Sequence, residues 1–259
     1  MNLTDEQLDR YARHIVLRDV GGRGQKKLLG TKVLVVGAGG LGSPMLLYLA
    51  AAGVGTLGII DDDNVDLSNL QRQIAHETAD IDRAKVKSAQ ASIERLNPDI
   101  KVVPYQTRLN SDNAQDVLSE YDLVADGTDN FETRFLLNDT CFFLRKPLVS
   151  GAMLQFEGQI STYKAYEEGN NPCYRCVFPA PPPPEIAQTC GEAGVLGALA
   201  GVIGSLQAIE IIKEILGVGD SLSGRLLLYD ALSTEFRKIK ISRDPACALC
   251  GSEATFLRP

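Results

Sequence analysis

The 259-residue sequence has no tryptophan and few other aromatic residues, and its formal net charge of −7 leaves no excess of basic side chains. A protein that binds the phosphate backbone of a nucleic acid needs a broad basic surface. One that binds single strands also needs aromatic side chains on which bases can stack. The composition therefore predicts no nucleic-acid partner.

The sequence also lacks an apolar secretory signal, because its first residues, MNLTDEQLDRYARHIVL, are charged and amphipathic. Its most apolar stretch, Val195 to Leu216, still carries a glutamine and three charged residues, which a membrane span would tolerate poorly. We therefore expect a buried helix there, no membrane partner and a cytoplasmic location. Thiols stay reduced in the cytoplasm, so the six cysteines are expected to be ligands or nucleophiles rather than disulfides.

Short β-branched runs alternate with helical segments through the first half of the chain. Strands are expected at 32–37, 56–60, 100–105 and 121–125, and helices at 41–52, 83–96, 111–119 and 131–144. An amphipathic helix over 5–17 and a glycine-rich turn at 21–24 precede them. This alternation predicts an α/β fold with a Rossmann-like, doubly wound sheet that is mostly parallel in its first half.

The second half of the chain has a different character. Further strands, including antiparallel ones, are expected at 148–149, 159–163, 226–229 and 235–241, and the proline run 179–184 should be an exposed loop. No repeat and no linker separates two folds. We predict one continuous domain over residues 1–259, with a helical arm at 1–30 and halves at 31–150 and 151–259.

A glycine-rich loop, Gly37-Ala38-Gly39-Gly40-Leu41-Gly42, joins the first expected strand of the sheet to a helix. Gly37 permits a tight turn, Gly39 lets the backbone approach a phosphate, and Gly42 lets the helix pack closely. Asp61, at the end of the next strand, is placed to accept hydrogen bonds from ribose hydroxyls. The motif predicts a nucleotide but leaves NAD and ATP open.

The polar segment 61–73 favours ATP over NAD. A nicotinamide cofactor needs one acid there, whereas ATP with magnesium needs cations for three phosphates, which Arg72 and Lys85 could supply. Asn69 and Gln73 would be neutral donors, and Asp129, after the strand 121–125, could hold Mg²⁺. Taken singly, Arg72 and Lys85 would be interpreted as solvated charges, so the prediction rests on their coincidence with the glycine loop.

The cysteines predict a structural metal site. Cys173 and Cys176 form one C-x-x-C pair and Cys247 and Cys250 another, and two such pairs favour a closed Cys₄ zinc site over a redox motif. Cys141 lies in an apolar helix and is expected in the core. Cys190 stands apart in a loop region, where a spectator thiol is the favoured interpretation over a reactive one.

Together, these motifs resemble the bacterial adenylyltransferases related to ubiquitin-activating enzymes, the HesA/MoeB/ThiF family, over essentially the whole chain. The resemblance is carried by RYARHIVL, GAGGLG, DDDNVDLSNLQRQ, TDN, CYRC, AGVLG, GVIGSLQAIE and CALC. VSGAMLQFEGQIS and YDALSTEFRKIKI resemble the molybdopterin branch more than the thiamine branch. Gly127 departs from the pattern, since these enzymes often have a cysteine before TDN.

The resemblance implies specific site residues. Arg13, on the opening helix, would reach the triphosphate from the other subunit of a homodimer, and Asp129 would be the Mg²⁺ ligand. Residues 31–150 would form the ATP-binding half, and residues 151–259, with the zinc site and the loop 177–192, the carrier-binding half. Arg13, Arg72, Lys85 and Asp129 would serve catalysis, with Cys190 as a less favoured addition. The ATP site would contain Gly37, Gly39, Gly40, Gly42, Asp61, Ser68, Asn69, Leu70, Gln71, Arg72, Gln73, Lys85, Asp129 and Asn130.

The implied reaction is ATP-dependent adenylation of the C-terminal glycine of a ubiquitin-like sulfur carrier, with release of pyrophosphate. A carboxylate is already ionised at neutral pH, which agrees with a chain whose only histidines, His14 and His76, lack a catalytic setting. Sulfur would come from another protein, such as a cysteine desulfurase or rhodanese, or from another cysteine. The alternatives are a thiamine-pathway enzyme with an acyl-persulfide on Cys190, an NAD-dependent oxidoreductase, and an inert zinc-stabilised binding protein.

Overall fold

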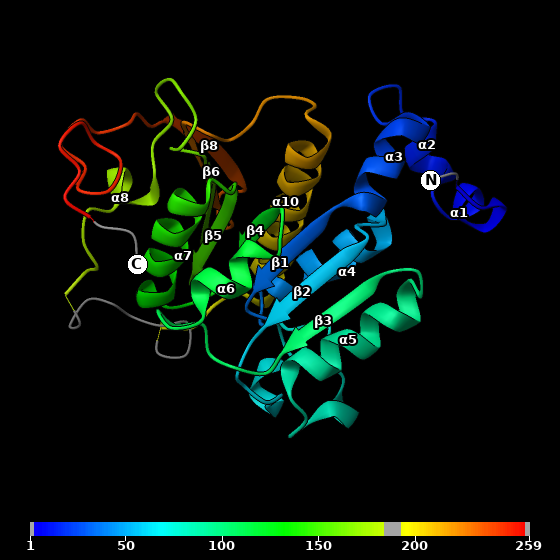
Figure 1. Ribbon diagram of the computed structural model, residues 1–259. Coiled ribbons are helices and arrows are strands. Elements are labelled where there is room, and N and C mark those ends of the chain that lie inside the picture. Colours follow the sequence, from blue (N-terminus) through cyan, green and yellow to red (C-terminus); the bar gives the residue numbers. More distant parts are fainter. Residues whose placement is uncertain (1–2, 184–192, 257–259) are drawn as a thin grey trace.

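The computed structural model describes residues 3–183 and 193–256, and these form one sheet with helices on both faces (Figure 1). The eight strands lie in the order β3-β2-β1-β4-β5-β6-β7-β8. The predicted fold class, a Rossmann-like sheet with a parallel first half and an antiparallel second half, is confirmed. The strands are β1 Lys32–Val36, β2 Thr56–Ile60, β3 Lys101–Tyr105, β4 Leu123–Asp126, β5 Leu148–Leu154, β6 Glu157–Tyr163, β7 Arg225–Asp230 and β8 Glu235–Lys240.

The direction of pairing changes at β5. The first five strands along the sheet, β3-β2-β1-β4-β5, pair in parallel. Helical crossovers return the chain to the same end of the sheet each time. From β5 onward the pairs are antiparallel, and β8 is exposed along its whole length. The carboxyl ends of β1, β2 and β4 therefore meet at one edge, where open α/β sheets bind their ligands.

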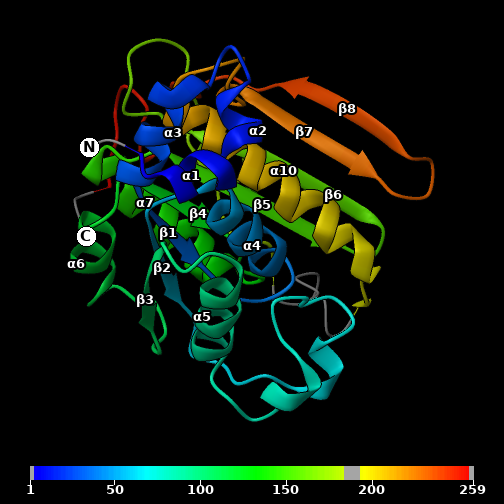
Figure 2. The same cartoon turned by 90° about the vertical axis from the view of Figure 1, so that its right-hand side faces the viewer.

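Alternate residues of β1 enter different cores on the two faces of the sheet. Val33 and Val35 pack in a cluster with α4 Gly42–Ala52, α5 Lys85–Leu96 and α10 Gly197–Leu216. Leu34 and Val36 pack in another with α6 Ala114–Ser119 and α7 Phe131–Leu144. Figure 2, turned by 90°, shows α4, α5 and α10 over one face of the sheet. Cys141 of α7 is buried in the second cluster, as predicted.

The apolar segment near residues 195–216 is α10, and its two buried polar side chains, Gln207 and Glu210, both form hydrogen bonds. The Gln207 Nε2 donates to the carbonyl oxygen of Asp126 at 2.7 Å. Glu210 accepts from Thr162 Oγ1 at 3.0 Å and forms an ion pair with Lys213. Among the helices that the structure describes, none is both long and apolar enough to cross a membrane.

Two expectations for the N-terminal arm are wrong. The helix predicted over 5–17 is interrupted at Tyr11 into α1 Asp5–Arg10 and α2 Ala12–Ile15, because the buried Tyr11 hydroxyl accepts from Asn97 Nδ2 at 2.9 Å. The predicted turn at 21–24 is the first turn of α3 Gly21–Gly30. A Cβ at position 24 would lie 3.1 Å from Leu216 Cδ2, so the glycine serves close packing of α3 on α10. The short elements are η1 Leu67–Asn69, η2 Thr78–Asp80 and α8 Tyr174–Val177.

Candidate nucleotide site and cysteine cluster

The glycine loop forms the expected tight turn between β1 and α4. Gly37 has φ +94°, and a Cβ there would lie 2.8 Å from the carbonyl oxygen of Gly127. A Cβ at Gly42 would lie 2.0 Å from the carbonyl oxygen of Gly37, so only glycine allows α4 to start this close to the strand. The N-terminus of α4 thus lies beside the loop, with backbone N–H groups available to an anion.

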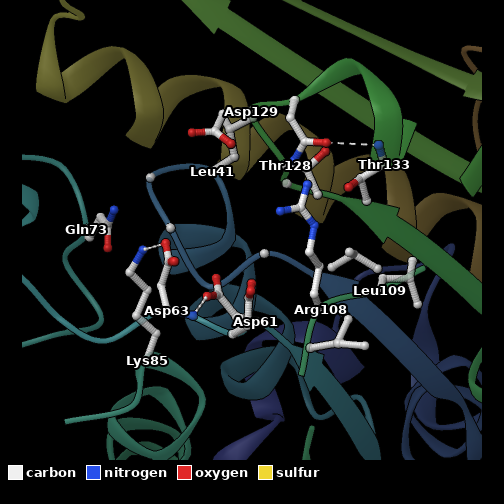
Figure 3. Close-up of a pocket in the computed structure, with 18 of the residues that line it drawn as sticks. Leu41, Asp61, Asp63, Gln73, Lys85, Arg108, Leu109, Thr128, Asp129 and Thr133 are labelled. Atoms are coloured by element: carbon white, nitrogen blue, oxygen red, sulfur yellow. Dashed lines mark hydrogen bonds and ion pairs between the residues drawn. The ribbon is translucent and has the colours of Figure 1, made fainter. Parts of the chain in front are cut away.

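A cavity of about 360 Å³ opens beside this loop, at the carboxyl ends of the parallel strands (Figure 3). Its walls come from the loop itself, from the ends of β1 and β2, from the segment before α5 and from the loop after β4. The predicted residues that line it are Gly37, Gly39, Gly40, Asp61, Arg72, Gln73, Lys85, Asp129 and Asn130. Residues separated by almost a hundred positions in the sequence therefore share one pocket.

Asp61 holds the glycine loop in place. One carboxylate oxygen accepts from the backbone N–H of Ala38 at 2.8 Å and the other from that of Asp63 at 2.9 Å. Burial raises the pKa of Asp61, while the charge of Lys85 and these two hydrogen bonds oppose the rise. Each oxygen keeps a free lone pair, so the carboxylate can still accept from a ribose hydroxyl.

Two cations line the pocket on the side of α5. Lys85 is buried and its Nζ lies 2.7 Å from Asp63 Oδ2, which is itself exposed. Arg72 Nη1 donates to the carbonyl oxygen of Ser68 at 3.1 Å. Figure 3 shows the Lys85–Asp63 pair and Asp129 entering the pocket from different elements. A polyphosphate bound between them would compete with Asp63 for the ammonium group of Lys85.

Two neutral predicted residues have contrasting environments. The Asn130 side chain caps α7 by accepting from the Thr133 N–H at 2.9 Å, so its oxygen already has a structural partner. The side-chain oxygen of Gln73 is buried with no hydrogen-bond partner among the described residues. Gln73 lines the pocket as a residue, although this oxygen itself is closed off from it.

His76 helps to hold the glycine loop in place. Its Nε2 contacts the carbonyl oxygen of Ala38 at 2.8 Å, and because a carbonyl only accepts, this nitrogen carries the proton. Its Nδ1 lies 2.7 Å from Ser88 Oγ, and the same hydroxyl lies 2.7 Å from Asp80 Oδ2. Burial lowers the pKa of His76. With both nitrogens engaged, the side chain is a strut between the glycine loop and α5.

Several predicted residues do not line the pocket in this chain. The carboxylate of Asp66 caps η1, so Ser68 and Asn69 are engaged in a local capping box. Arg13 is exposed on α2. Cys190 lies outside the residues that the structure describes. The predicted residues absent from the lining are Arg13, Gly42, Ser68, Asn69, Leu70 and Gln71.

Two arginines that line this pocket were not predicted from the sequence. Arg108 follows β3 and forms an ion pair with Glu132 at 3.1 Å. Arg134 is buried on α7, and its Nη2 donates to the carbonyl oxygen of Thr128 at 2.6 Å. The sequence position of each arginine could have indicated that it lies near the pocket. Arg108 comes just after a strand that ends at the ligand edge, and Arg134 stands one helical turn after Asn130.

The four paired cysteines come together although the two pairs are far apart in the sequence. The Sγ atoms of Cys173 and Cys247 are 3.5 Å apart, those of Cys176 and Cys250 3.3 Å, and all four lie within 4.8 Å of one another. Tetrahedral zinc at about 2.3 Å from each sulfur separates the sulfurs by about 3.8 Å. Four thiols at such spacing fit a closed Cys₄ site, with no position left for water.

The cysteine cluster is fixed to α7 by polar contacts. The backbone N–H of Tyr174 donates to Asn138 Oδ1 at 2.7 Å. Arg175 forms a bidentate ion pair with Asp139, with both N···O distances at 2.7 Å. The first C-x-x-C pair is therefore held on the helix that begins beside the nucleotide pocket.

Comparison with known proteins gives a consistent result. Residues 11–249 match the family described as "ThiF family". The chain is 49% identical to "Sulfur carrier protein adenylyltransferase" of Thermus thermophilus, over 98% of this chain and 95% of that protein. It is 50% identical to "Adenylyltransferase and sulfurtransferase MOCS3" of Anopheles gambiae and of Bos taurus, and spans 58% and 55% of their lengths.

Solved structures agree with the fold. The chain superposes on "Crystal structure of E. coli MccB + ATP" with a TM-score of 0.80, over 96% of this chain and 75% of that chain. The two sequences are 21% identical, so this likeness concerns the fold alone.

Proposed function

The chain belongs to the ThiF family, and from this premise we propose that it uses ATP to adenylate the C-terminal carboxylate of a ubiquitin-like sulfur-carrier protein. The observation that carries the proposal is the content of one pocket: a glycine loop with Arg72, Lys85, Arg108, Arg134 and Asp129 around it. A nicotinamide cofactor carries a diphosphate and has little use for so many cations. A triphosphate that becomes pyrophosphate and a nucleotidyl group requires them.

In the proposed reaction, the triphosphate binds at the glycine loop and the N-terminus of α4, and Asp61 accepts from the ribose. Lys85 leaves Asp63 for a phosphate, and Arg72 lies beside the same charge. ATP binds as its Mg²⁺ complex, and Asp129 is the carboxylate that would hold the ion. These groups position the phosphates and stabilise the charge that develops on them when pyrophosphate leaves.

A second cavity, of about 290 Å³, supports a path for the carrier. It shares Asp129, Arg134 and Met153 with the nucleotide pocket, and its other walls come from β5, β6, β7, β8, α7 and the α8 segment. We propose that the flexible tail of the carrier lies in this cavity with its carboxylate pointed at the α-phosphate. The carboxylate is ionised at neutral pH, so no general base is needed.

The proposal also includes a zinc site, a pathway, a sulfur donor and a location. Cys173, Cys176, Cys247 and Cys250 would hold zinc, which contributes stability and no chemistry in a closed site. We assign the molybdopterin branch on the segments VSGAMLQFEGQIS and YDALSTEFRKIKI, with a cysteine desulfurase or rhodanese as sulfur donor. A carrier from the thiamine pathway, with an acyl-persulfide on Cys190, is the alternative. The cytoplasm is the proposed location.

The test is carrier-dependent exchange of labelled pyrophosphate into ATP. The proposal expects exchange only when a carrier ending in Gly-Gly is present, and none with a carrier that lacks its terminal glycine. An NAD-dependent oxidoreductase would instead bind NAD and show no exchange. Absence of exchange with both molybdopterin-type and thiamine-type carriers would overturn the proposal.

We also propose that the active form is a homodimer in which Arg13 completes the site of its partner. Arg13 is exposed away from the pocket, and the adjacent Val16 and Leu17 are 74% and 52% exposed, as expected of side chains that a second chain covers. Arg13→Ala and Asp129→Ala proteins should each be inactive. Their co-expression should restore about a quarter of native activity, since half of the random dimers have one intact site.

A recovery of this size in exchange assays requires that the two residues act across the interface. Separately purified variants mixed without exchange of subunits provide the control and should stay inactive. If co-expressed variants recover nothing while mixed dimers are detected by mass spectrometry, the shared site is wrong.

A further inference from the structure

Both backbone polar groups of Ala38, within the glycine loop, are held by side chains from outside the loop. Its N–H donates to Asp61 Oδ2 at 2.8 Å, and its carbonyl oxygen accepts from His76 Nε2 at 2.8 Å. Ala38 is fully buried, and the residue on each side of it is a glycine. Because glycine backbones rotate freely, the loop would adopt many orientations without these two contacts. The shape of the loop therefore depends on Asp61 and His76.

The contact with His76 fixes the direction of the next N–H group along the chain. The peptide bond between Ala38 and Gly39 is trans, so its carbonyl oxygen and its N–H point in opposite directions. The oxygen points to His76, and neither Ala38 nor His76 lines the nucleotide pocket, whereas Gly39 does. The Gly39 N–H is therefore directed from the interior toward the pocket, beside the N-terminus of α4, where an anion is favoured.

Two further buried side chains hold the imidazole of His76. Its Nδ1 lies 2.7 Å from Ser88 Oγ on α5, and this hydroxyl lies 2.7 Å from Asp80 Oδ2. Asp80 is itself fixed, because it accepts from the Glu77 N–H at 3.2 Å and forms an ion pair with Arg83 at 3.0 Å. A line of contacts thus runs from Asp80 through Ser88 and the imidazole to the glycine loop.

The contact between His76 and the loop needs no proton transfer. Burial lowers the pKa of His76, and Lys85 lowers it further, while the hydrogen bond to Ala38 and the charges of Asp61 and Asp80 oppose the change. A carbonyl oxygen only accepts, so Nε2 carries a proton in the neutral ring as well as in the charged one. His76 can therefore orient the loop in either charge state.

We infer that His76, held by Ser88 and Asp80, is a positioning residue for nucleotide binding, which orients the Gly39 N–H so that this group donates to a phosphate of ATP. The inference rests on the proposed use of ATP. A donor that is oriented in advance spares the ligand the cost of ordering the loop, so affinity depends on a side chain that does not line the pocket. The dependence concerns phosphate, and adenosine alone should not show it.

The first experiment compares His76→Met with His76→Gln. Methionine removes the donor, whereas glutamine keeps an amide N–H close to the place of Nε2. Calorimetry with ATP and Mg²⁺, without a carrier, should show about tenfold weaker binding in His76→Met and a value within about threefold of native in His76→Gln. Adenosine, measured by competition with labelled ATP, has no phosphate, so both variants should bind it within about twofold of native.

The second experiment tests whether Ser88 acts through His76. Ser88→Ala should weaken ATP binding about fivefold in the native chain and by less than about twofold in His76→Met, where the imidazole is already absent. Ser92→Ala is the matched control, because Ser92 is on the same helix and donates to the carbonyl oxygen of Ala75, the residue before His76, at 2.7 Å. It should leave ATP affinity within about twofold.

Turnover provides a further readout. In the exchange assay, His76→Met should raise the KM for ATP about tenfold with kcat within about threefold of native. Native ATP affinity in His76→Met, an equal loss for ATP and adenosine, an equal loss in His76→Gln, or the same effect in Ser92→Ala overturns the role of His76. Failure of the proposed function is a different result, namely that the native protein itself binds no ATP or supports no exchange with any carrier.

Discussion

Replacement of Asp129 by asparagine is expected to lower carrier-dependent pyrophosphate exchange by about 100-fold or more. Asp129 lies at the carboxyl end of β4, lines the nucleotide pocket and is solvent-exposed, so it contributes little to folding. Asparagine preserves the size of the side chain but removes the negative charge that would hold Mg²⁺ against the phosphates. The loss should therefore appear in kcat, with an unchanged thermal midpoint and a raised Mg²⁺ requirement.

The matched control is Asp62→Asn, which changes the same charge in the same pocket. Asp62 is an exposed residue between Asp61 and Asp63, where three carboxylates lie close enough to bind a cation. We expect its exchange rate within about threefold of native, since an exposed carboxylate that holds no metal is screened by solvent. A large loss in Asp62→Asn with a small one in Asp129→Asn would place the metal at the acidic cluster and contradict our assignment.

The nucleotide loop could be predicted because its constraints are local. Gly37 is favoured by the positive φ of the turn and Gly42 by a close contact with Gly37 within it, and Asp61 ends the strand that pairs next to β1. Asp129 could be placed at the same edge because parallel strands end together. Local pattern and sheet topology were sufficient for these residues, and no knowledge of side-chain packing was needed.

The remaining pocket residues depend on packing between distant elements, which sequence patterns do not show. Asp63 looked like one member of an acidic run, and only the fold reveals its ion pair with Lys85. The position of Arg134, one helical turn after Asn130, could have placed it near the pocket. Its hydrogen bond to the Thr128 carbonyl oxygen has no sequence signature.

The N-terminal arm shows a similar limit. Glycines at 21–24 predict a turn on local grounds because glycine is a poor helix former. The structure uses Gly24 for contact between α3 and the side chain of Leu216, almost two hundred residues away. A tertiary contact thus overrides a local preference, and the predicted turn becomes the start of a helix.

Removal of zinc is expected to have the largest effect on stability. The segment 244–256 is held to the body mainly by a small cluster of Ala165, Leu249 and the cysteines, with Phe142 and Phe143 packed beside it. A Cys₄ site contributes on the order of 10 kcal/mol of binding free energy at neutral pH, which far exceeds what such a small apolar cluster provides. Without metal, this end of the chain should open.

The expected result for Cys250→Ser is loss of stoichiometric zinc, rapid proteolysis within 244–256 and a lower thermal midpoint. A cost of about 3 kcal/mol corresponds to roughly 6–12 °C for a chain of this size. Because the thiols must ionise to bind metal, the native protein should also lose zinc, and with it this stability, as the pH falls. Cys141→Ala is the control, since Cys141 is buried in the α7 core away from the cluster and should retain full zinc content. The measurement is metal content by mass spectrometry, together with the thermal midpoint. A Cys250→Ser protein that retains one zinc per chain with an unchanged midpoint would show that the cluster does not bind the metal as a four-thiolate site.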